Sequence, residues 1–181
     1  MNLYFRIIWM FLRAKFGKSL AIWDNFTRSF LVWPNDLDVY GHMNNGRYLT
    51  IADLARTEMM IRTGFWKMLK KRGFYPVLAG ETVQFRRSLL LFRRFTLRTR
   101  LVGWDQHFFY MEHYYHCGRP SALVMVRIRV IGKGAREVTP QSLMHDFGES
   151  GLEPERMNEV LKLWNDSTRL HWEELERGSE N

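Results

Sequence analysis

Cysteine is almost missing from this chain, because Cys117 stands alone among 181 residues. One cysteine cannot close an intramolecular disulfide, and it excludes a cysteine-rich metal site. So little cysteine is typical of a reducing compartment, and we expect the cytoplasm. We interpret Cys117, which stands beside a predicted turn, as a small buried residue.

Long uncharged apolar runs are also missing. Four bases interrupt the apolar N-terminal segment LYFRIIWMFLRAKFGKSLAIW, namely Arg6, Arg13, Lys15 and Lys18. Its longest uncharged stretch is residues 7–12, whereas a spanning helix needs about 20 predominantly apolar residues. No small-residue cleavage site follows at the distance typical of a signal peptide. Two hypotheses stay open for residues 1–22: a helix docked on its own domain, or an interfacial helix with its bases toward lipid headgroups at the inner face of a membrane.

Acidic residues are scarce outside the C-terminal tail. The net charge is +8, and residues 149–181 hold nine acids and four bases, which leaves +13 on residues 1–148. A basic body favours phosphorylated ligands, polyanions or anionic membrane surfaces as partners. We do not expect nucleic acid, because no nucleic-acid motif is present and the aromatic residues alternate as core residues do.

What is present indicates an α+β fold. A short strand ends at Trp33, and RYLTIADLARTEMMIRTG then carries apolar residues at helical spacing up to Gly64, a typical C-cap. A second short helix, FWKMLKKRG, follows. Period-two alternation then predicts strands in ETVQFRRS, RFTLRTRLVGW and ALVMVRIRVIG. The aromatic-rich segment HFFYMEHYYHC, which the turn residues GRP follow, is also read as a strand. We expect the last three strands in chain order to form an antiparallel meander. One long central helix of broad apolar face predicts a curved antiparallel sheet wrapped around it.

The length and the apolar content of 46% suit one well-filled core with appendages. We expect an apolar and basic N-terminal helix over residues 1–24 and the main domain over 25–135. Residues 136–181 should form a helical, acidic tail, with a helix in RMNEVLKLW and a frayed end over the last ten residues.

A dense polar cluster, DLDVYGHMNNGRYL, separates the first strand from the long helix. A helix that starts near Asn45 presents unpaired backbone N–H groups and a partial positive charge. Asp38 would stay ionised there and could act as a nucleophile or activate water, while the N–H groups polarise a carbonyl. Gly41 would permit a close approach or positive φ, His42 could donate to the carbonyl, and Asn44 could cap the helix. The alternative is that these residues only form a turn and a cap.

The run VWPNDLDVYGHMNNGRYL resembles the opening motif of hot-dog-fold acyl thioesterases of the 4-hydroxybenzoyl-CoA thioesterase type, and it is also similar to plant acyl-ACP thioesterases. Their pattern is an apolar strand, D-x-D-x-x-G-H-x-N-N, a tyrosine and a long central helix. Seven positions match: Asp36, Asp38, Gly41, His42, Asn44, Asn45 and Tyr48. The resemblance extends loosely over residues 27–133.

This resemblance implies a hydrolase that cleaves acyl-CoA or acyl-carrier-protein thioesters, with coenzyme A entering as part of the substrate and no other cofactor. Asp38 would be the catalytic carboxylate, and Asn45 would lie at the helix start that polarises the carbonyl. Another branch of the superfamily uses a glutamate on the central helix, which makes Glu58 a candidate, although a solvated or ion-paired role is the simpler interpretation. The family joins sheets edge to edge, so a homodimer or a tetramer is implied.

Six arginines and no acid fall between Thr82 and Trp104. Arginines on outward strand positions can simply protect a solvated face. Alternatively, Arg86, Arg87 and Arg93 bind the phosphates of coenzyme A or the acidic surface of a carrier protein.

Other kinds of site are less well supported by the sequence. His113 and His116 are three apart on a predicted strand and therefore face opposite sides, so we expect no metal there. Two other functions stay open: a non-catalytic acyl-binding, membrane-associated hot-dog protein, and a dehydratase that pairs His42 with Asp38.

Overall fold

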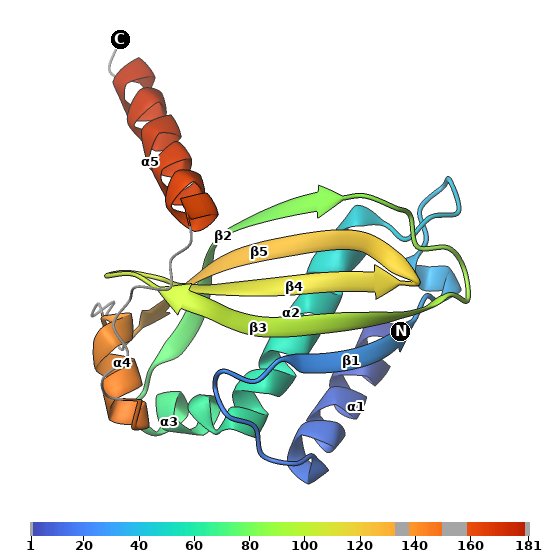
Figure 1. The fold of residues 1–181 in the computed structure, drawn as a ribbon, viewed down its shortest axis with the longest axis horizontal. Helices are drawn as coiled ribbons and strands as arrows, with labels where there is room; N and C mark the ends of the chain where they lie inside the picture. The colour runs from blue at the N-terminus through green and yellow to red at the C-terminus, as the bar shows by residue number, and fades with distance from the viewer. Residues whose placement is uncertain (1, 133–137, 150–158, 180–181) are drawn as a thin grey trace.

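The computed structural model describes residues 2–132, 138–149 and 159–179, and within them five antiparallel strands form one sheet in the order β1-β3-β4-β5-β2. The strands are β1 (Phe26–Leu31), β2 (Tyr75–Phe85), β3 (Arg94–Trp104), β4 (Phe109–Cys117) and β5 (Arg119–Ile131). The α-helices of these ranges are α1 (Asn2–Phe16), α2 (Asn45–Thr63), α3 (Phe65–Lys71), α4 (Pro140–Phe147) and α5 (Glu159–Ser179), and a short 3-10 helix, η1 (Pro34–Asp36), follows β1. The sheet curves around α2, which lies along one of its faces (Figure 1). The predicted α+β architecture is confirmed.

Helix α2 begins and ends where its sequence predicts. The Asn44 side chain accepts a hydrogen bond from the Gly46 N–H at the N-cap, and Gly64 closes the helix at a φ of 83°. This left-handed conformation costs glycine little, because it has no Cβ. Ile51, Ala55 and other apolar residues of α2 are buried against the sheet.

The inner face of the sheet is set by its register. Residues paired directly across antiparallel strands share a face, and one such row runs through Leu97, Tyr115, Ala122 and Phe85. Tyr115 is fully buried, and its hydroxyl donates to the Tyr48 carbonyl of α2 at 2.5 Å. The core therefore lies between α2 and this inner face.

Strand β2 begins six residues earlier than predicted, at Tyr75 instead of Glu81. Its first half, YPVLAG, shows no clear alternation, and the register shifts between Leu78 and Gly80. Proline and a bulge are tolerated here because β2 is an edge strand. Period-two patterning could not reveal a bulged, largely exposed segment.

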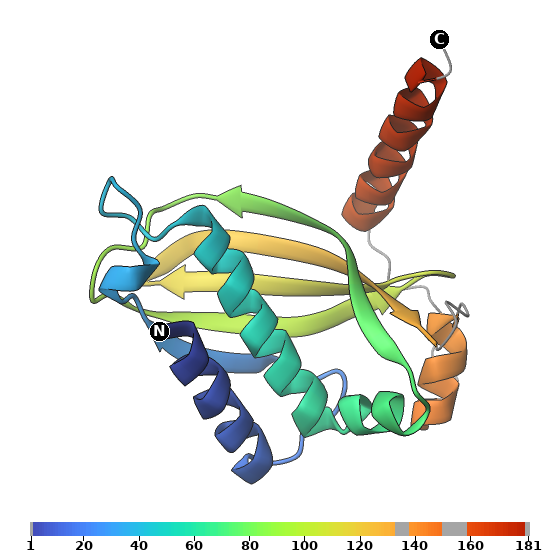
Figure 2. The same ribbon diagram turned by 180° about the vertical axis from the view of Figure 1, so that it is seen from behind.

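Helix α1 docks against α2, and the two lie side by side in both views of the ribbon (Figures 1 and 2). On the side of α1 that faces the domain, Met10 and Ala14 are buried. Docking, one of the two hypotheses for the N-terminal segment, is thus observed. No helix within the described ranges combines the length and the apolarity that crossing a bilayer requires.

The C-terminal part is more regular than expected. Helix α5 continues to Ser179, whereas the last ten residues were predicted to be frayed. The Arg169–Glu173 ion pair at 2.7 Å, of the i, i+4 type, supports its second half. Residues 156–158 of the predicted RMNEVLKLW helix and the predicted domain boundary at residue 135 lie outside the described residues. Helix α5 projects away from the sheet (Figure 1).

Candidate active site

The first aspartate of the polar cluster, Asp36, anchors the loop. Its side chain is 1% exposed, and Oδ2 accepts from the Trp33 N–H at 2.9 Å. Arg6 of α1 donates to both carboxylate oxygens, and Arg47 lies 3.8 Å from Oδ1. The Asp36 carbonyl accepts from the Asn44 N–H at 2.8 Å. Asp36 thus holds the loop, the start of α2 and the N-terminal helix together.

The second aspartate, Asp38, is held differently. Its Oδ1 accepts from the backbone N–H groups of Tyr40, at 2.9 Å, and His42, at 3.1 Å. Asp38 is only partly buried, and its Oδ2 has no hydrogen-bond partner within residues 2–132, 138–149 and 159–179. Two backbone donors on one oxygen fix the orientation of the carboxylate. The other oxygen is available to a substrate or to water.

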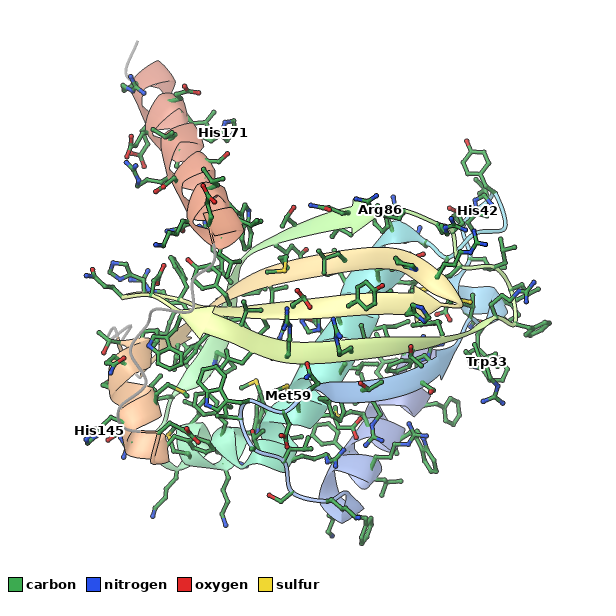
Figure 3. The ribbon with its side chains drawn as sticks, viewed as in Figure 1. Trp33, His42, Met59, Arg86, His145 and His171 are labelled. Atoms are coloured by element: carbon green, nitrogen blue, oxygen red, sulfur yellow. The ribbon has the colours of Figure 1, made fainter. Side chains whose placement is uncertain are left out.

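The loop closes tightly around this carboxylate. Gly41 has a φ of 74°, the left-handed conformation that its identity predicts, and its N–H donates to the Asp38 carbonyl at 3.1 Å. The Asp38 N–H in turn donates to the His42 carbonyl at 2.8 Å. His42 itself is exposed (Figure 3). The imidazole can therefore reach a ligand that approaches from solvent.

The start of α2 lies directly after this loop. The Asn44 side-chain oxygen is engaged as the cap, whereas Asn45, the first residue of the helix, is exposed. The first turn of a helix leaves backbone donors without partners inside the helix. A carboxylate and a helix N-terminus are thus joined by a short, hydrogen-bonded loop, which suits the polarisation of a carbonyl beside a base.

Tyr48 occupies a different environment. It is buried, and its ring makes edge contacts with Phe85 and Tyr115. Burial raises the pKa of its phenol above the usual 10.0. The structure places this residue in the core beneath the loop, where it supports the start of α2.

The arginine-rich segment lies beside the polar loop. His42 forms a β-bridge with Leu90, and the Met43 N–H donates to the Leu89 carbonyl at 2.8 Å. Arg86, Arg87 and Arg93 flank these residues and are exposed. Figure 3 places His42 and Arg86 at the same end of the sheet.

A cleft of about 380 Å³ opens in this segment. Arg87 and Arg93 line it together with Cys117, the last residue of β4, and Arg119, the first residue of β5, and no acid is among its lining residues. Arg86 is not among these residues. Sequence reasoning missed Arg119, because the turn residues around it gave no reason to place them against a segment some 30 positions earlier. Convergent guanidinium groups suit phosphate.

Glu58 is a buried structural carboxylate. It forms an ion pair with Arg28 of β1, and Arg62 lies 3.9 Å away. The ion-paired interpretation is confirmed, and solvation is excluded. A different carboxylate of α2, Asp53, is exposed and pairs with Arg56. The pKa of Glu81 on β2 is raised, first by burial and then by the charge of Asp53.

The histidines face opposite sides of β4, as their spacing predicts. His113 is fully buried, its Nδ1 lies 2.9 Å from Thr99 Oγ1, and burial followed by the charge of Arg56 lowers its pKa to about 3. Its Nε2 has no hydrogen-bond partner within the described part of the chain. Across those same residues, no group of three or more His, Cys, Asp and Glu side chains could hold a metal.

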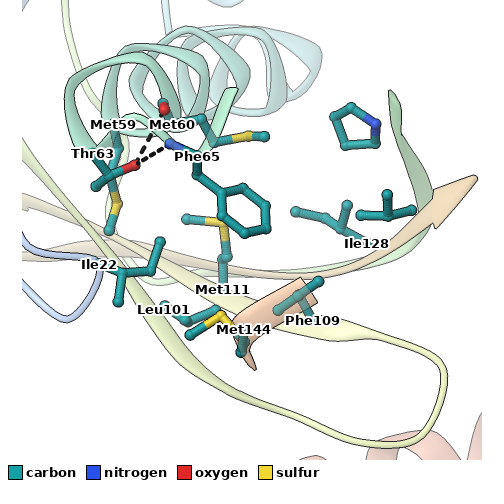
Figure 4. A pocket seen from close by; sticks show the side chains of 12 residues that line it. Ile22, Met59, Met60, Thr63, Phe65, Leu101, Phe109, Met111, Ile128 and Met144 are labelled. Atoms are coloured by element: carbon teal, nitrogen blue, oxygen red, sulfur yellow. Dashed lines mark hydrogen bonds between the residues drawn. The ribbon is translucent and has the colours of Figure 1, made fainter. Parts of the chain in front are cut away.

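An apolar cavity lies near the C-terminal end of α2, away from the polar loop. It measures about 40 Å³, and methionines contribute much of its wall: Met59, Met60, Met111 and Met144 (Figure 4). Asn45 and Met59 are 14 residues apart on one helix, which corresponds to about 21 Å at 1.5 Å per residue. Flexible methionine side chains adapt readily to different apolar ligands.

Comparisons with known proteins identify the family and the fold of this chain. The model of the thioesterase-like superfamily matches residues 32–164. Protein THEM6 of Xenopus laevis is 40% identical over 143 residues, which cover 77% of this chain and 68% of that protein.

Two solved structures share the fold. YbaW, a probable thioesterase from Escherichia coli, has a TM-score of 0.65 at 17% identity and covers 71% of this chain and 99% of its own. Slr0204, a 1,4-dihydroxy-2-naphthoyl-CoA thioesterase from Synechocystis, has a TM-score of 0.60 at 12% identity and covers 71% and 98%.

Proposed function

Because the chain belongs to the thioesterase-like superfamily and has its hot-dog fold, we propose that it hydrolyses acyl thioesters with Asp38 as the catalytic carboxylate. One observation supports this most strongly: two backbone N–H groups fix Asp38 Oδ1 while Oδ2 is left without a partner in the described chain. A residue that served only as a turn former would have no need of a partly exposed, oriented and open carboxylate oxygen beside a helix N-terminus.

The chemistry follows from that placement. The carbonyl oxygen of the thioester accepts hydrogen bonds from donors at the start of α2, around Asn45, and from His42. As a general base, Asp38 takes a proton from water while the water oxygen bonds to the carbonyl carbon. The tetrahedral oxyanion then collapses, the C–S bond breaks, and the thiolate takes the proton from Asp38.

Asp38 could instead attack the carbonyl carbon itself. The carboxylate oxygen would then form an anhydride with the acyl group and release the thiolate, and water would hydrolyse the anhydride to the free acid and regenerate Asp38. Both routes use the same open oxygen, Oδ2. Gly41 and Asn44 hold the loop in either case, because they fix its turn and the helix start.

We assign acyl-CoA as the first substrate class, with an acylated carrier protein as the alternative. Arg87, Arg93 and Arg119 line an open cleft beside the polar loop and would bind the phosphates of coenzyme A, while Arg86 extends the basic surface. Slr0204, which shares the fold, acts on a coenzyme A thioester. Coenzyme A enters as part of the substrate.

A homodimer, or a dimer of dimers, completes the proposal. Strand β2 is an edge of the sheet and exposes Tyr75, Leu78 and Phe85. An edge strand with exposed apolar residues is a template for pairing with a second copy. Phe85 contacts Tyr48 of α2, so such pairing would bring a partner close to the start of this helix.

Free-thiol release from short, medium, long and aromatic acyl-CoAs tests the function. We expect turnover by the natural chain and a loss of at least about 100-fold in kcat for Asp38→Asn, because an amide cannot serve as a base or nucleophile. Asp166→Asn on α5 is the matched control and should keep full activity. Both variants should keep the thermal unfolding midpoint. In Asp38→Asn the amide oxygen still accepts hydrogen bonds from the Tyr40 and His42 N–H groups.

If no acyl-CoA is cleaved, acylated carrier protein is the next substrate. Failure with both, or an Asp38→Asn variant as active as the control, would overturn the catalytic assignment. A non-catalytic acyl-binding protein would then be indicated by acyl ligands that copurify with the chain.

A further inference from the structure

Helix α1 attaches to the body through a narrow stripe. Met10 and Ala14 are buried, and Arg6 donates to Asp36 and, at 2.8 Å, to the Leu31 carbonyl. These residues recur at a spacing of four, so they share one side of the helix. The side of α1 opposite this stripe faces away from the domain.

That outward surface is apolar. Phe5, Ile8, Leu12 and Phe16 follow one another at spacings of three and four, and they are 66%, 58%, 45% and 79% exposed. Tyr4, Trp9 and Phe11 are exposed as well. A helix on the surface of a soluble domain normally turns charged and polar residues outward. Here the outward side of α1 carries the densest group of exposed aromatic and aliphatic side chains on any helix of the described ranges.

The surroundings of this surface are basic. No acid occurs in residues 1–23, while Lys15 stands in the last turn of α1 and Lys18 lies two residues beyond its end. The guanidinium of Arg13 lies over the Trp9 ring, 5.1 Å from its centroid. Positive charge and apolar side chains therefore occupy the same side of the molecule.

A cleft of about 300 Å³ separates α1 from β1. Among the residues that line it are Trp9, Arg13, Trp33 and Arg94. Arg94 forms no ion pair within the described residues, and the acid in the cleft wall, Glu58, is already paired with Arg28. Besides Arg6, which is paired with Asp36, the cleft thus offers two guanidinium groups and two indole rings. Guanidinium groups bind phosphate, and indole rings favour the headgroup level of a bilayer.

We propose that the outward face of α1 and this cleft dock the protein on the surface of a bilayer that contains anionic phospholipids. Phe5, Ile8, Leu12 and Phe16 enter the boundary between headgroups and acyl chains, and Arg13 and Arg94 bind lipid phosphates. An interfacial helix needs an apolar side flanked by bases, and 15 residues are enough for that role though not for a span.

A second copy of the chain fits this face less well. A two-fold contact brings the same surface of each copy together, so the basic border of one α1 would meet the basic border of the other. Like charges at close range oppose such a contact. Anionic lipid instead complements the bases and accepts the apolar side chains at the same time.

Binding of α1 to a bilayer would also bring the polar loop close to the lipid surface. Arg6 joins α1 to Asp36, two residues before Asp38, so the loop and the helix are held together. The carboxylate of Asp38 would lie close to the lipid surface, where long acyl chains enter or leave. Lipid binding itself does not require the thioesterase activity, and the two are tested separately.

Cosedimentation with vesicles is the test, using phosphatidylcholine alone and phosphatidylcholine mixed with phosphatidylglycerol. The natural chain should bind the mixed vesicles. The triple variant Phe5→Ser, Ile8→Ser and Leu12→Ser should lower the partition coefficient about tenfold or more, because it removes apolar area that the bilayer buries. The matched control, Val160→Ser, Leu163→Ser and Leu175→Ser, removes three exposed apolar residues from α5 and should bind normally.

A charge variant provides a second readout. Arg13→Gln with Arg94→Gln should weaken binding to the mixed vesicles about fivefold per base and change binding to phosphatidylcholine little. Lys67→Gln with Lys70→Gln on α3 is its control. The proposal is overturned if the natural chain stays in the supernatant, if the α1 triple variant binds as well as the natural chain, or if the α5 control loses as much. A change from dimer to monomer in the α1 variant without vesicle binding would assign the face to a second copy instead.

Discussion

Arg6 of the N-terminal helix and Asp36 of the polar loop form a two-point ion pair, with Nη1–Oδ1 at 3.1 Å and Nη2–Oδ2 at 2.7 Å. Asp36 is almost wholly buried, and Arg6 is largely so. Of the two aspartates in the motif, the first therefore supports the loop from the N-terminal helix, and the second presents a free oxygen.

Removal of Asp36 should destabilise the protein. Asp36→Ala leaves Arg6 without its partner and the Trp33 N–H without an acceptor, so we expect the free energy of unfolding to fall by about 3 kcal/mol. Chemical denaturation of Asp36→Ala, Arg6→Ala and the double variant measures this. The double variant should lose much less than the sum of the two single losses, and simple additivity would contradict a direct pair.

Glu58 should contribute to stability and not to turnover. Glu58→Gln removes the charge that compensates Arg28 and Arg62 in a buried setting, and we expect the free energy of unfolding to fall by about 2 kcal/mol. Below the unfolding transition, kcat for the best acyl-CoA should stay within about twofold of the natural value. A large loss of kcat in a fully folded Glu58→Gln variant would move the catalytic role onto α2.

The carboxylates Asp36, Asp38 and Glu58 show which features of the site could be predicted from the sequence. Spacing alone located α2 and its caps, because Asn44 and Gly64 act through local backbone geometry. Period-two alternation likewise located β3 and β5, and aromatic content with a following turn located β4 between them. Family resemblance pointed to Asp38, and the structure adds the hydrogen bonds that hold it.

Features that depend on distant parts of the chain were not predictable in the same way. The burial of Asp36 depends on Arg6, which lies 30 residues away, and the burial of Glu58 depends on Arg28 of β1. Arg119 lies beside Arg87 and Arg93 in one cleft only because β4 and β5 bring the chain back to that end of the sheet. Residue type and spacing report local periodicity, whereas these contacts follow from the tertiary fold.

The cleft lined by Arg87, Arg93 and Arg119 should affect the binding of coenzyme A thioesters selectively. Arg87→Gln and Arg119→Gln should each raise KM for an acyl-CoA about tenfold, because each removes charge-assisted hydrogen bonds to phosphate. Neither should alter kcat/KM for the matching N-acetylcysteamine thioester, which has no phosphate. Lys70→Gln on α3 serves as the charge control. Equal losses with both thioesters would show that these arginines act on the fold or on the reacting group.

His113 predicts a pH dependence of stability. Its ring is buried between α2 and the sheet, and burial lowers its pKa from 6.5 to about 3 in the folded chain. Between these two values the unfolded chain binds a proton at this position and the folded chain does not. Folding stability should therefore fall as the pH drops below 6.5, by about 1.4 kcal/mol for each pH unit, until the pH reaches about 3.

The variant His113→Asn isolates this effect from the other five histidines. Asparagine has no ionisable group, and its amide can still reach Thr99 Oγ1, so its stability should depend less steeply on pH. Urea denaturation at pH 7.5 and pH 5.5 should show the natural chain losing about 1.4 kcal/mol more than His113→Asn over this interval. Parallel losses in the two proteins would mean that His113 is protonated in the folded state, and that its Nε2 finds an acceptor when it carries the charge.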